Sequence, residues 1–240
     1  MNKQTTHCGF VALIGAPNAG KSTITNDFVG SKVSIVSPKV QTTRSLVRGI
    51  GIFENTQIIF IDTPGIFKPT HTAGSVALDV LKRYPHRAIF YPFQGFSAGR
   101  KADFSRLPLF LEVADRSDWA ALEHFARGLS SQVYEADSAR RKKIHLAGVI
   151  ANNFVNQLYA TATDLLAESG LGYEVLKPLI EETAAKALDA SHPARVQTGP
   201  AKRGDRATQE GHLALLAENE ALKQIYELLS EQIWETSKKI

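Results

Sequence analysis

The sequence predicts an α/β N-terminal domain followed by an all-α helical domain. An apolar run over residues 10–15 leads directly into a glycine-rich loop and a helix, an order typical of the start of a nucleotide-binding sheet. Further strand-like runs, rich in β-branched and aromatic residues, recur up to residue 136. After Asp137 the periodic segments have the 3.6-residue repeat of helices, so the strands are expected to stop there.

The glycine-rich loop reads Gly15-Ala-Pro-Asn-Ala-Gly20-Lys21-Ser22 and fits the phosphate-binding pattern G-x-x-x-x-G-K-[ST]. Its glycines let successive backbone N–H groups turn toward a phosphate, and the following helix adds the positive end of its dipole. Lys21 would reach the outer phosphates, and the Ser22 hydroxyl would ligate Mg²⁺. The alternative is a turn that only looks like such a loop, and the apolar strand before it argues against that.

The composition is that of an ordinary globular protein. Of 240 residues, 43% are hydrophobic and 22% charged, which is enough apolar material for a sizeable core. The formal net charge of +4 is mild, and basic residues cluster only at 140–143 and 202–203, so no nucleic-acid stripe is expected. The single cysteine, Cys8, excludes an intrachain disulfide and favours a reducing compartment. With no run long enough for a membrane span and a polar start, a cytoplasmic protein is expected.

The first third of the chain is expected to alternate strands and helix. After the strand at 10–15, a helix over 21–29 would end at Gly30, and residues 31–44 are polar and loop-like. Residues 45–53 and 56–62 look like two strands joined at Glu54-Asn55, which predicts a hairpin. The second of these strands ends in Asp62-Thr-Pro-Gly65.

The rest of the chain is expected to contain three more strands and then helices. Residues 87–93, 107–113 and 132–136 read as strands, with a helix over 119–129 between the last two. A long helix begins near Ser138 and ends at Gly170, where a left-handed glycine can close it. Further helices are predicted over residues 173–190, 207–217 and 220–236, with a Gly/Pro loop at 192–206.

Three further features lie where a nucleotide switch would need them. Gln41-Thr42-Thr43-Arg44 follows the first helix, and a threonine hydroxyl there could complete the Mg²⁺ shell beside Ser22. Asp62 ends an apolar strand, which places a carboxylate to hold a magnesium-bound water, and the Gly65 N–H could bind a terminal phosphate. A lone D-T-P-G is weak evidence, but together with the phosphate loop and Thr43 it becomes specific.

At this point residues from about 8 to 69 resemble the opening of the Era family of bacterial ribosome-assembly GTPases. The resemblance rests on GAPNAGKST, VGSKVSIVSPKVQTTRSLVRGI and IDTPGIFKP. It implies GTP with Mg²⁺ as ligand, Thr43 as the γ-phosphate sensor, and Asn18 as the loop residue that holds K⁺ in potassium-stimulated relatives. The implied Mg²⁺ ligands are Ser22, Thr43 and Asp62. The implied phosphate-binding residues are Gly15, Asn18, Ala19, Gly20, Lys21, Ser22, Thr23 and Gly65.

The departures from that family are equally informative. No Asn-Lys-x-Asp occurs in the chain, so the aspartate that would read the guanine ring is missing. Ile66 follows Gly65 where some GTPases carry a water-orienting glutamine, so hydrolysis is expected to be slow or absent. Nothing in the chain resembles the family's RNA-binding domain.

From about residue 71 the chain resembles a different family. The segments HTAGSVALDVL, FYPFQ, SAGRKADF, HLAGVIANNFVN and QTGPAKRGD are similar to a family of NADP-dependent oxidoreductases, related in style to pyrroline-5-carboxylate reductase and 6-phosphogluconate dehydrogenase. That resemblance implies late Rossmann strands followed by a helical domain of unknown function. It would also imply NADP, but the dinucleotide turn G-x-G-x-x-G is absent, and Gly49-Ile-Gly51 lacks the third glycine.

One polar group in the helical part is a candidate site. At about 100° per residue, His145, Asn153 and Asn156 fall within about 80° of one another on a helix, so they could line one pocket with His145 as an acid or base. The alternative is a dimer or core interface whose polar groups satisfy one another.

The chain therefore reads as a chimera-like joining near residues 69–72. The predicted parts are a P-loop GTPase-like segment (1–70), a Rossmann-like α/β segment (71–137) and a helical, dimerising domain (138–240). A shuffled or engineered chimera, a natural fusion and an assembly artefact all fit this pattern. Three functions fit as well: Mg²⁺-dependent triphosphate binding with slow or no hydrolysis, an NADP-linked oxidoreductase acting through the helical domain, and a helical dimerisation module without activity.

Overall fold

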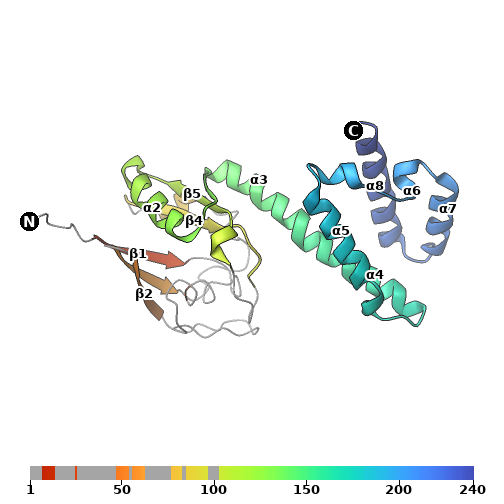
Figure 1. The fold of residues 1–240 in the computed structure, drawn as a ribbon, viewed down its shortest axis with the longest axis horizontal. Coiled ribbons are helices and arrows are strands. Elements are labelled where there is room, and N and C mark those ends of the chain that lie inside the picture. The colour runs from red at the N-terminus through yellow and green to blue at the C-terminus, as the bar shows by residue number, and fades with distance from the viewer. Residues whose placement is uncertain are drawn as a thin grey trace, which may run out of the picture. The chain divides into compact units, whose positions relative to one another are not determined.

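The computed structural model describes residues 7–13, 25, 47–53, 56–62, 77–82, 85–96 and 103–240. The chain divides into two compact units, Met1–Gln157 and Leu158–Ile240 (Figure 1). The first unit holds the strands, and the second is helical. The predicted fold class, an α/β part followed by an all-α part, is confirmed.

The first sheet contains β1 (His7–Leu13), β2 (Val47–Phe53) and β3 (Thr56–Asp62) in the order β1-β3-β2. Strands β2 and β3 are antiparallel with Phe53 opposite Thr56, which confirms the predicted hairpin. Strands β1 and β3 are parallel. The antiparallel β2 returns the chain to the edge where β3 begins, because Val47 lies opposite Asp62 and Phe53 lies opposite Thr56. Between β1 and β2, Thr25 is helical and fully buried.

The second sheet contains β4 (Ala88–Pro92), β5 (Leu109–Val113) and β6 (Val133–Glu135). The central strand, β5, is antiparallel to β4 and parallel to β6. Helix α2 (Trp119–Leu129) connects β5 to β6 and covers one face of the sheet. The buried core on that face consists of Leu107, Leu109, Leu111 and Ala126.

Among the described strands, the two sheets share no ladder hydrogen bonds. Each three-stranded sheet pairs only within itself. The GTPase-like strands and the Rossmann-like strands therefore do not merge into one continuous sheet in this part of the chain, although both belong to the first compact unit.

A long continuous helix follows the second sheet. It comprises α3 (Ser138–Gly148), a π-helical segment η4 (Val149–Phe154) and α4 (Val155–Glu168). The side chain of Asp137 caps its start by accepting a hydrogen bond from the Arg140 N–H, at 2.7 Å, so Asp137 rather than Ser138 is the cap. After its end, Gly170 adopts a φ of 72°, the left-handed conformation expected from the sequence.

The second unit contains most of α4 and ends with α8 (Glu220–Ser237), its longest helix. Helix α6 (Pro200–Arg203), inside the predicted loop, packs against both α7 (Arg206–Leu215) and α8. The preceding elements are η5 (Tyr173–Val175), α5 (Lys177–Asp189) and η6 (Pro193–Val196). No helix in the described ranges is long and apolar enough to span a membrane. The first unit also contains the short η1 (Leu78–Leu81), η2 (Phe104–Arg106) and η3 (Arg116–Asp118).

Candidate functional site

The first candidate site is the edge of the first sheet where β1 and β3 end. The parallel register places Leu13, the last residue of β1, opposite Asp62, the last residue of β3. The carboxyl ends of both strands therefore lie at one edge. In the sequence, the phosphate-loop pattern begins two residues after Leu13, the residue that lies opposite Asp62. The carboxyl edge of parallel strands is where phosphate-binding loops and magnesium-orienting carboxylates occur in nucleotide-binding sheets.

Most of the residues predicted for this site lie outside the described residues. Asp62 is described as the end of β3. The remaining predicted residues lie outside the described ranges: Gly15, Asn18, Ala19, Gly20, Lys21, Ser22, Thr23, Thr43 and Gly65.

The second candidate site lies between the second sheet and α3. Alternate residues of β5 face opposite sides of the sheet, and Leu109 and Leu111 belong to the core shared with α2. Phe110 and Glu112 therefore face the other side. Tyr91 is the register partner of Phe110 on β4, and Tyr134 is its partner on β6. These side chains face the long helix, which contacts Glu112 and Tyr91.

A buried ion pair fixes the start of the helix to this face. The Arg141 guanidinium, whose side chain is 1% exposed, donates to the Glu112 carboxylate. The same carboxylate accepts hydrogen bonds from the Ser138 N–H at 3.0 Å and from the Ser138 hydroxyl at 2.9 Å. A carboxylate at the first turn of a helix also interacts favourably with the helix dipole. Three residues on two elements thereby set the position of α3 on the sheet.

His145 lies one helical turn after Arg141 and contacts Tyr91. The Tyr91 hydroxyl and His145 Nδ1 are 3.1 Å apart, and the two rings meet edge to face. Burial raises the pKa of the Tyr91 phenol above its usual value, and the nearby Arg141 charge partly opposes that rise. The phenol is therefore neutral at physiological pH and can share a proton with the imidazole.

The chain beyond β4 continues along the same helix. A Cβ atom built on Gly148 would lie 2.7 Å from the Phe93 ring, and one built on Gly95 would lie 3.4 Å from the Asn152 amide nitrogen. Alternate residues of the segment 91–95 therefore lie next to helix residues that are three or four positions apart, namely His145, Gly148 and Asn152. Two strand residues advance about 6.6 Å and three or four helix residues about 5 Å, so the two periods nearly match.

The π-helical segment changes which polar side chains share a face. With about 85° per residue instead of 100° over η4, Asn153 lies at nearly the same helix angle as His145, and Asn156 lies about 75° away. The three predicted residues therefore remain on one side of the helix. His145 is half-buried against Tyr91, whereas Asn153 and Asn156 are exposed. π-helical turns occur frequently at functional sites.

Sequence reasoning missed four residues of this cluster: Tyr91, Glu112, Arg141 and Asn152. The predicted strand over residues 107–113 contained Glu112, but no sequence signal paired it with Arg141. In the described part of the chain, no group of three or more His, Cys, Asp or Glu residues could hold a metal ion. The Tyr91–His145 hydrogen bond makes the second site a candidate for proton transfer.

Comparison with known proteins assigns the two parts of the chain separately. Residues 107–233, more than half of the chain, match the family model "Domain of unknown function (DUF2520)". The chain belongs to the DUF2520 family. The matched range includes β5, α2, β6 and the long helix, and so the Glu112–Arg141 pair and His145. Tyr91 precedes the range.

The front of this DUF2520 chain matches a second family model, "50S ribosome-binding GTPase", over residues 10–101. GTPase Era of Mesorhizobium japonicum is 73% identical over 64 residues, which is 27% of this chain and 21% of that protein. GTPase Era of Sinorhizobium medicae matches to the same extent. The chain spans about a fifth of the length of these curated relatives.

Two solved structures match larger parts of the chain. A Bacteroides fragilis protein described as a candidate NADP oxidoreductase is 44% identical, with a TM-score of 0.58 over 69% of this chain and 63% of its own. A protein from Thermotoga maritima has a TM-score of 0.63 over 98% of this chain and 81% of its own, and at 18% identity it shows the fold alone. These findings confirm the expected resemblance of the two parts to different proteins, which is consistent with a chimera. The GTPase match extends to residue 101, beyond the predicted limit near 69.

Proposed function

We propose that the chain binds a nucleoside triphosphate with Mg²⁺ at the carboxyl edge of the first sheet. The observation that supports this proposal is the parallel register of Leu13 with Asp62, because the phosphate-loop sequence follows Leu13 and Asp62 carries a carboxylate. The identity of 73% over 64 residues with GTPase Era supports GTP as the ligand. Phosphate would be held by Gly15, Asn18, Ala19, Gly20, Lys21, Ser22, Thr23 and Gly65.

The residues at this edge fit Mg²⁺. Magnesium prefers hard oxygen ligands and keeps several of its waters. Asp62 supplies a carboxylate at the strand end, and the Ser22 and Thr43 hydroxyls would supply the remaining protein oxygens. Asn18 would add a K⁺ contact. When bound, the metal would neutralise phosphate charge; this chain's residues would orient the phosphates.

The proposed site discriminates poorly between bases and hydrolyses slowly or not at all. Without Asn-Lys-x-Asp, no side chain is assigned to the guanine ring, so GTP and ATP are expected to bind with similar affinity. With Ile66 after Gly65, no glutamine orients an attacking water.

The test is equilibrium binding of labelled GTP to the full chain in the presence of Mg²⁺, compared with the Lys21→Ala and Asp62→Asn variants. Lys143→Ala, which removes an exposed lysine from α3, is the matched control. Loss of one charge-assisted contact of about 1.5–3 kcal/mol raises Kd by about 10- to 100-fold. Equal GTP binding by wild type and Lys21→Ala would refute the proposal.

A second candidate function is favoured by the Tyr91–His145 contact. The Bacteroides fragilis likeness suggests an oxidoreductase that acts through the helical domain, with His145 as its acid or base and Asn153 and Asn156 lining the same side of the helix. Tyr91 would fix the imidazole orientation through Nδ1. The turn after β1 carries the triphosphate pattern and not G-x-G-x-x-G, so the residues there do not fit the pyrophosphate of NADP, and no step is assigned to that cofactor.

NADPH fluorescence tests this second candidate. A saturable change that His145→Asn weakens, while Lys143→Ala does not, would support an NADP-linked role. Unchanged NADPH fluorescence at high protein concentration would eliminate it.

We further propose that the chain is a cytoplasmic homodimer that pairs through its helical part. The helices of the second unit expose many large apolar side chains, including Leu179 at 63%, Leu228 at 63% and Leu215 at 85%. Only Ala201 and Leu216 are buried hydrophobic residues among those described there. A small helical unit with so little core gains stability when a partner covers its apolar surface. Sedimentation that shows only monomer would refute pairing.

A further inference from the structure

We propose that Glu112 is a positioning residue, which sets the rotation of α3 about its own axis and thereby keeps the His145 imidazole beside the Tyr91 hydroxyl. Glu112 acts through Ser138 and Arg141, the two helix residues that it binds. All five residues belong to the first compact unit. The inference rests on the second candidate function, in which His145 is the acid or base, and is independent of the triphosphate site.

Glu112 is the centre of a hydrogen-bonded cluster that also contains Ser138, Arg141 and the backbone N–H of Leu78. Its carboxylate accepts hydrogen bonds from the Ser138 N–H, the Ser138 hydroxyl and the Arg141 guanidinium. The Ser138 oxygen in turn accepts from the Leu78 N–H at 3.2 Å and from Arg141 Nη2 at 3.3 Å. A hydroxyl has one proton and two lone pairs, so these contacts use its full hydrogen-bonding capacity. The cluster therefore joins β5, α3 and the segment before η1 at one point.

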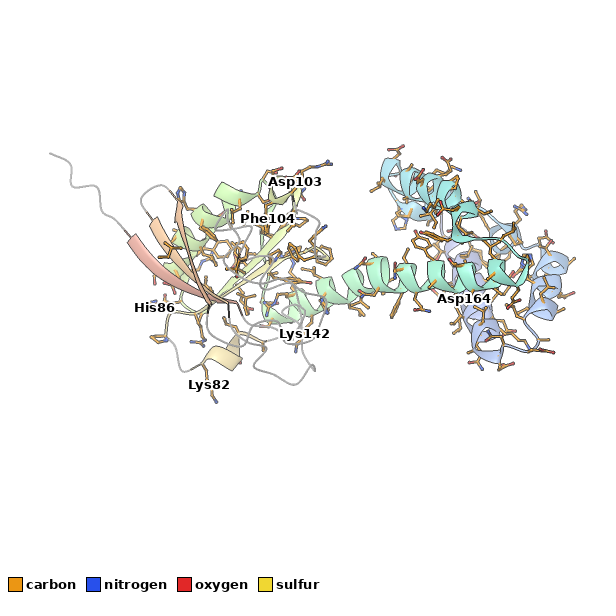
Figure 2. All side chains as sticks on the ribbon, turned by 90° about the horizontal axis from the view of Figure 1, so that it is seen from below. Lys82, His86, Asp103, Phe104, Lys142 and Asp164 are labelled. Atoms are coloured by element: carbon orange, nitrogen blue, oxygen red, sulfur yellow. The ribbon has the colours of Figure 1, made fainter. Side chains whose placement is uncertain are left out.

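This cluster holds the same side of the helix that carries His145. At about 100° per residue, Ser138, Arg141 and His145 lie within about 60° of one another on α3. Lys142, labelled on the helix in Figure 2, is turned about 100° from Arg141 and is exposed. Because Ser138 and Arg141 are both bound to one carboxylate, they fix which side of α3 faces the sheet.

A small rotation of the helix is enough to separate His145 from Tyr91. Side-chain atoms lie about 5–6 Å from a helix axis, so a rotation of about 10° moves an imidazole nitrogen by about 1 Å. A displacement of that size away from the phenol would take the 3.1 Å contact beyond hydrogen-bond range. The contact therefore depends on how firmly the rotation of α3 is held.

The other contacts on this side of the helix hold its rotation less firmly. The Tyr91–His145 contact is a single hydrogen bond, whereas Arg141 makes a charge-assisted bond with a side chain that is 1% exposed. A buried guanidinium that loses its carboxylate is strongly destabilised, so the pair resists any rotation that would break it. Gly148 lets the helix approach the Phe93 ring, but a glycine has no side chain that could oppose rotation. The Glu112 contacts therefore determine the rotation, and the Tyr91–His145 contact follows from it.

The ¹⁵N NMR signal of the His145 imidazole in the full chain tests the proposal. Labelled histidine gives signals from seven residues, and the His145→Asn variant identifies the one that belongs to His145. Tyr91→Phe removes only the phenol hydroxyl and gives the signal expected without the contact. At about pH 9 an imidazole of ordinary pKa is neutral, and the Tyr91 phenol stays protonated because burial raises its pKa.

Glu112→Gln should move the His145 signal by more than half of the difference between wild type and Tyr91→Phe. Glu135→Gln, which removes an exposed carboxylate from the neighbouring strand β6, is the matched control and should leave the signal unchanged. A His145 signal that stays at its wild-type value in Glu112→Gln would overturn the proposal. The second candidate function fails separately, by unchanged NADPH fluorescence, and that result leaves the positioning role standing.

A milder variant keeps the proposal falsifiable if Glu112→Gln does not fold. Ser138→Ala removes the hydroxyl but keeps the helix cap, because Asp137 supplies it. Its His145 signal should move toward the Tyr91→Phe value, and Ser138→Thr, which restores the hydroxyl, should return it to the wild-type value. An unchanged signal in Ser138→Ala would then overturn the proposal. Identical signals in wild type and Tyr91→Phe would also overturn it, since no contact would exist to be positioned.

Discussion

Substituting Gly148 by alanine probes the packing that places His145 beside Tyr91. In an open helix position this change stabilises by about 1 kcal/mol, because alanine loses less backbone entropy than glycine. At Gly148 the added Cβ would lie 2.7 and 2.9 Å from two Phe93 ring atoms, closer than real contacts allow. The ring is held on its other sides by Tyr91 and Phe110, with centroids 6.1 and 5.8 Å away. It therefore has little room to retreat.

The expected result is a net loss of stability. Overpacking costs about 1–3 kcal/mol, which offsets or exceeds the helix gain and gives a net change of about 0 to 2 kcal/mol in the destabilising direction. Gly128→Ala, in α2 of the same unit, meets nothing within 4 Å and should stabilise instead. The difference between the two variants isolates the overpacking cost.

Urea unfolding followed by the circular dichroism of the helices measures both variants, and Phe93→Leu in the Gly148→Ala background completes a double-mutant cycle. The smaller leucine should recover part of the loss. If Gly148→Ala were as stabilising as Gly128→Ala, Phe93 would not be packed against the helix, and the proposed placement of His145 would be wrong.

Two further predictions concern ionic and capping contacts, and a third concerns the choice of nucleotide. Glu112→Ala leaves the buried Arg141 charge without its carboxylate and should lower the free energy of unfolding in urea by about 3–5 kcal/mol. Arg116→Ala breaks an exposed ion pair with Glu135 and should lower it by less than about 1 kcal/mol. Equal losses would contradict the burial argument. Hydrogen bonds from Thr208 lower the pKa of Asp205, so the stability from this cap is complete above about pH 4 and is lost as pH falls through the folded-state pKa. Asp205→Asn should therefore reduce the fall of the thermal unfolding midpoint between about pH 6 and 2. An unchanged fall of the midpoint would contradict this prediction. Mg·GTP and Mg·ATP should bind with dissociation constants within about tenfold of each other, and a much larger preference for GTP would mean that an unrecognised group reads the base.

Local patterns in the sequence were sufficient to predict most of the elements. The two strand-like runs over residues 45–53 and 56–62, joined at Glu54-Asn55, predicted the hairpin of β2 and β3, and the predicted helix over 119–129 matches α2. These patterns record burial along one short segment, so they are readable without knowledge of the rest of the chain. The helical turn at Pro200 was missed because four residues bounded by glycines carry no periodicity.

The second candidate site was only partly predictable, because it depends on contacts between distant segments. His145 and its asparagines share a helix and could be related by angle, but Tyr91 is 54 positions away in sequence. The π-helical segment has no sequence signature in the 100° periodicity, yet it changes the angles on which the prediction rested. The buried pairing of Arg141 with Glu112 likewise follows from sheet register and helix placement, which one sequence does not reveal.

The central claim is that the front of the chain remains a triphosphate site although it is joined to a DUF2520 part. Thermal unfolding of the full chain, alone and with Mg·GTP, Mg·ATP or NADPH, tests it most directly. A ligand that binds only the folded state stabilises it by about 2.7 kcal/mol at a hundredfold excess over its dissociation constant. We expect both triphosphates to raise the unfolding midpoint in wild type but not in Lys21→Ala, and NADPH to leave it unchanged. A shift with NADPH alone would contradict the account.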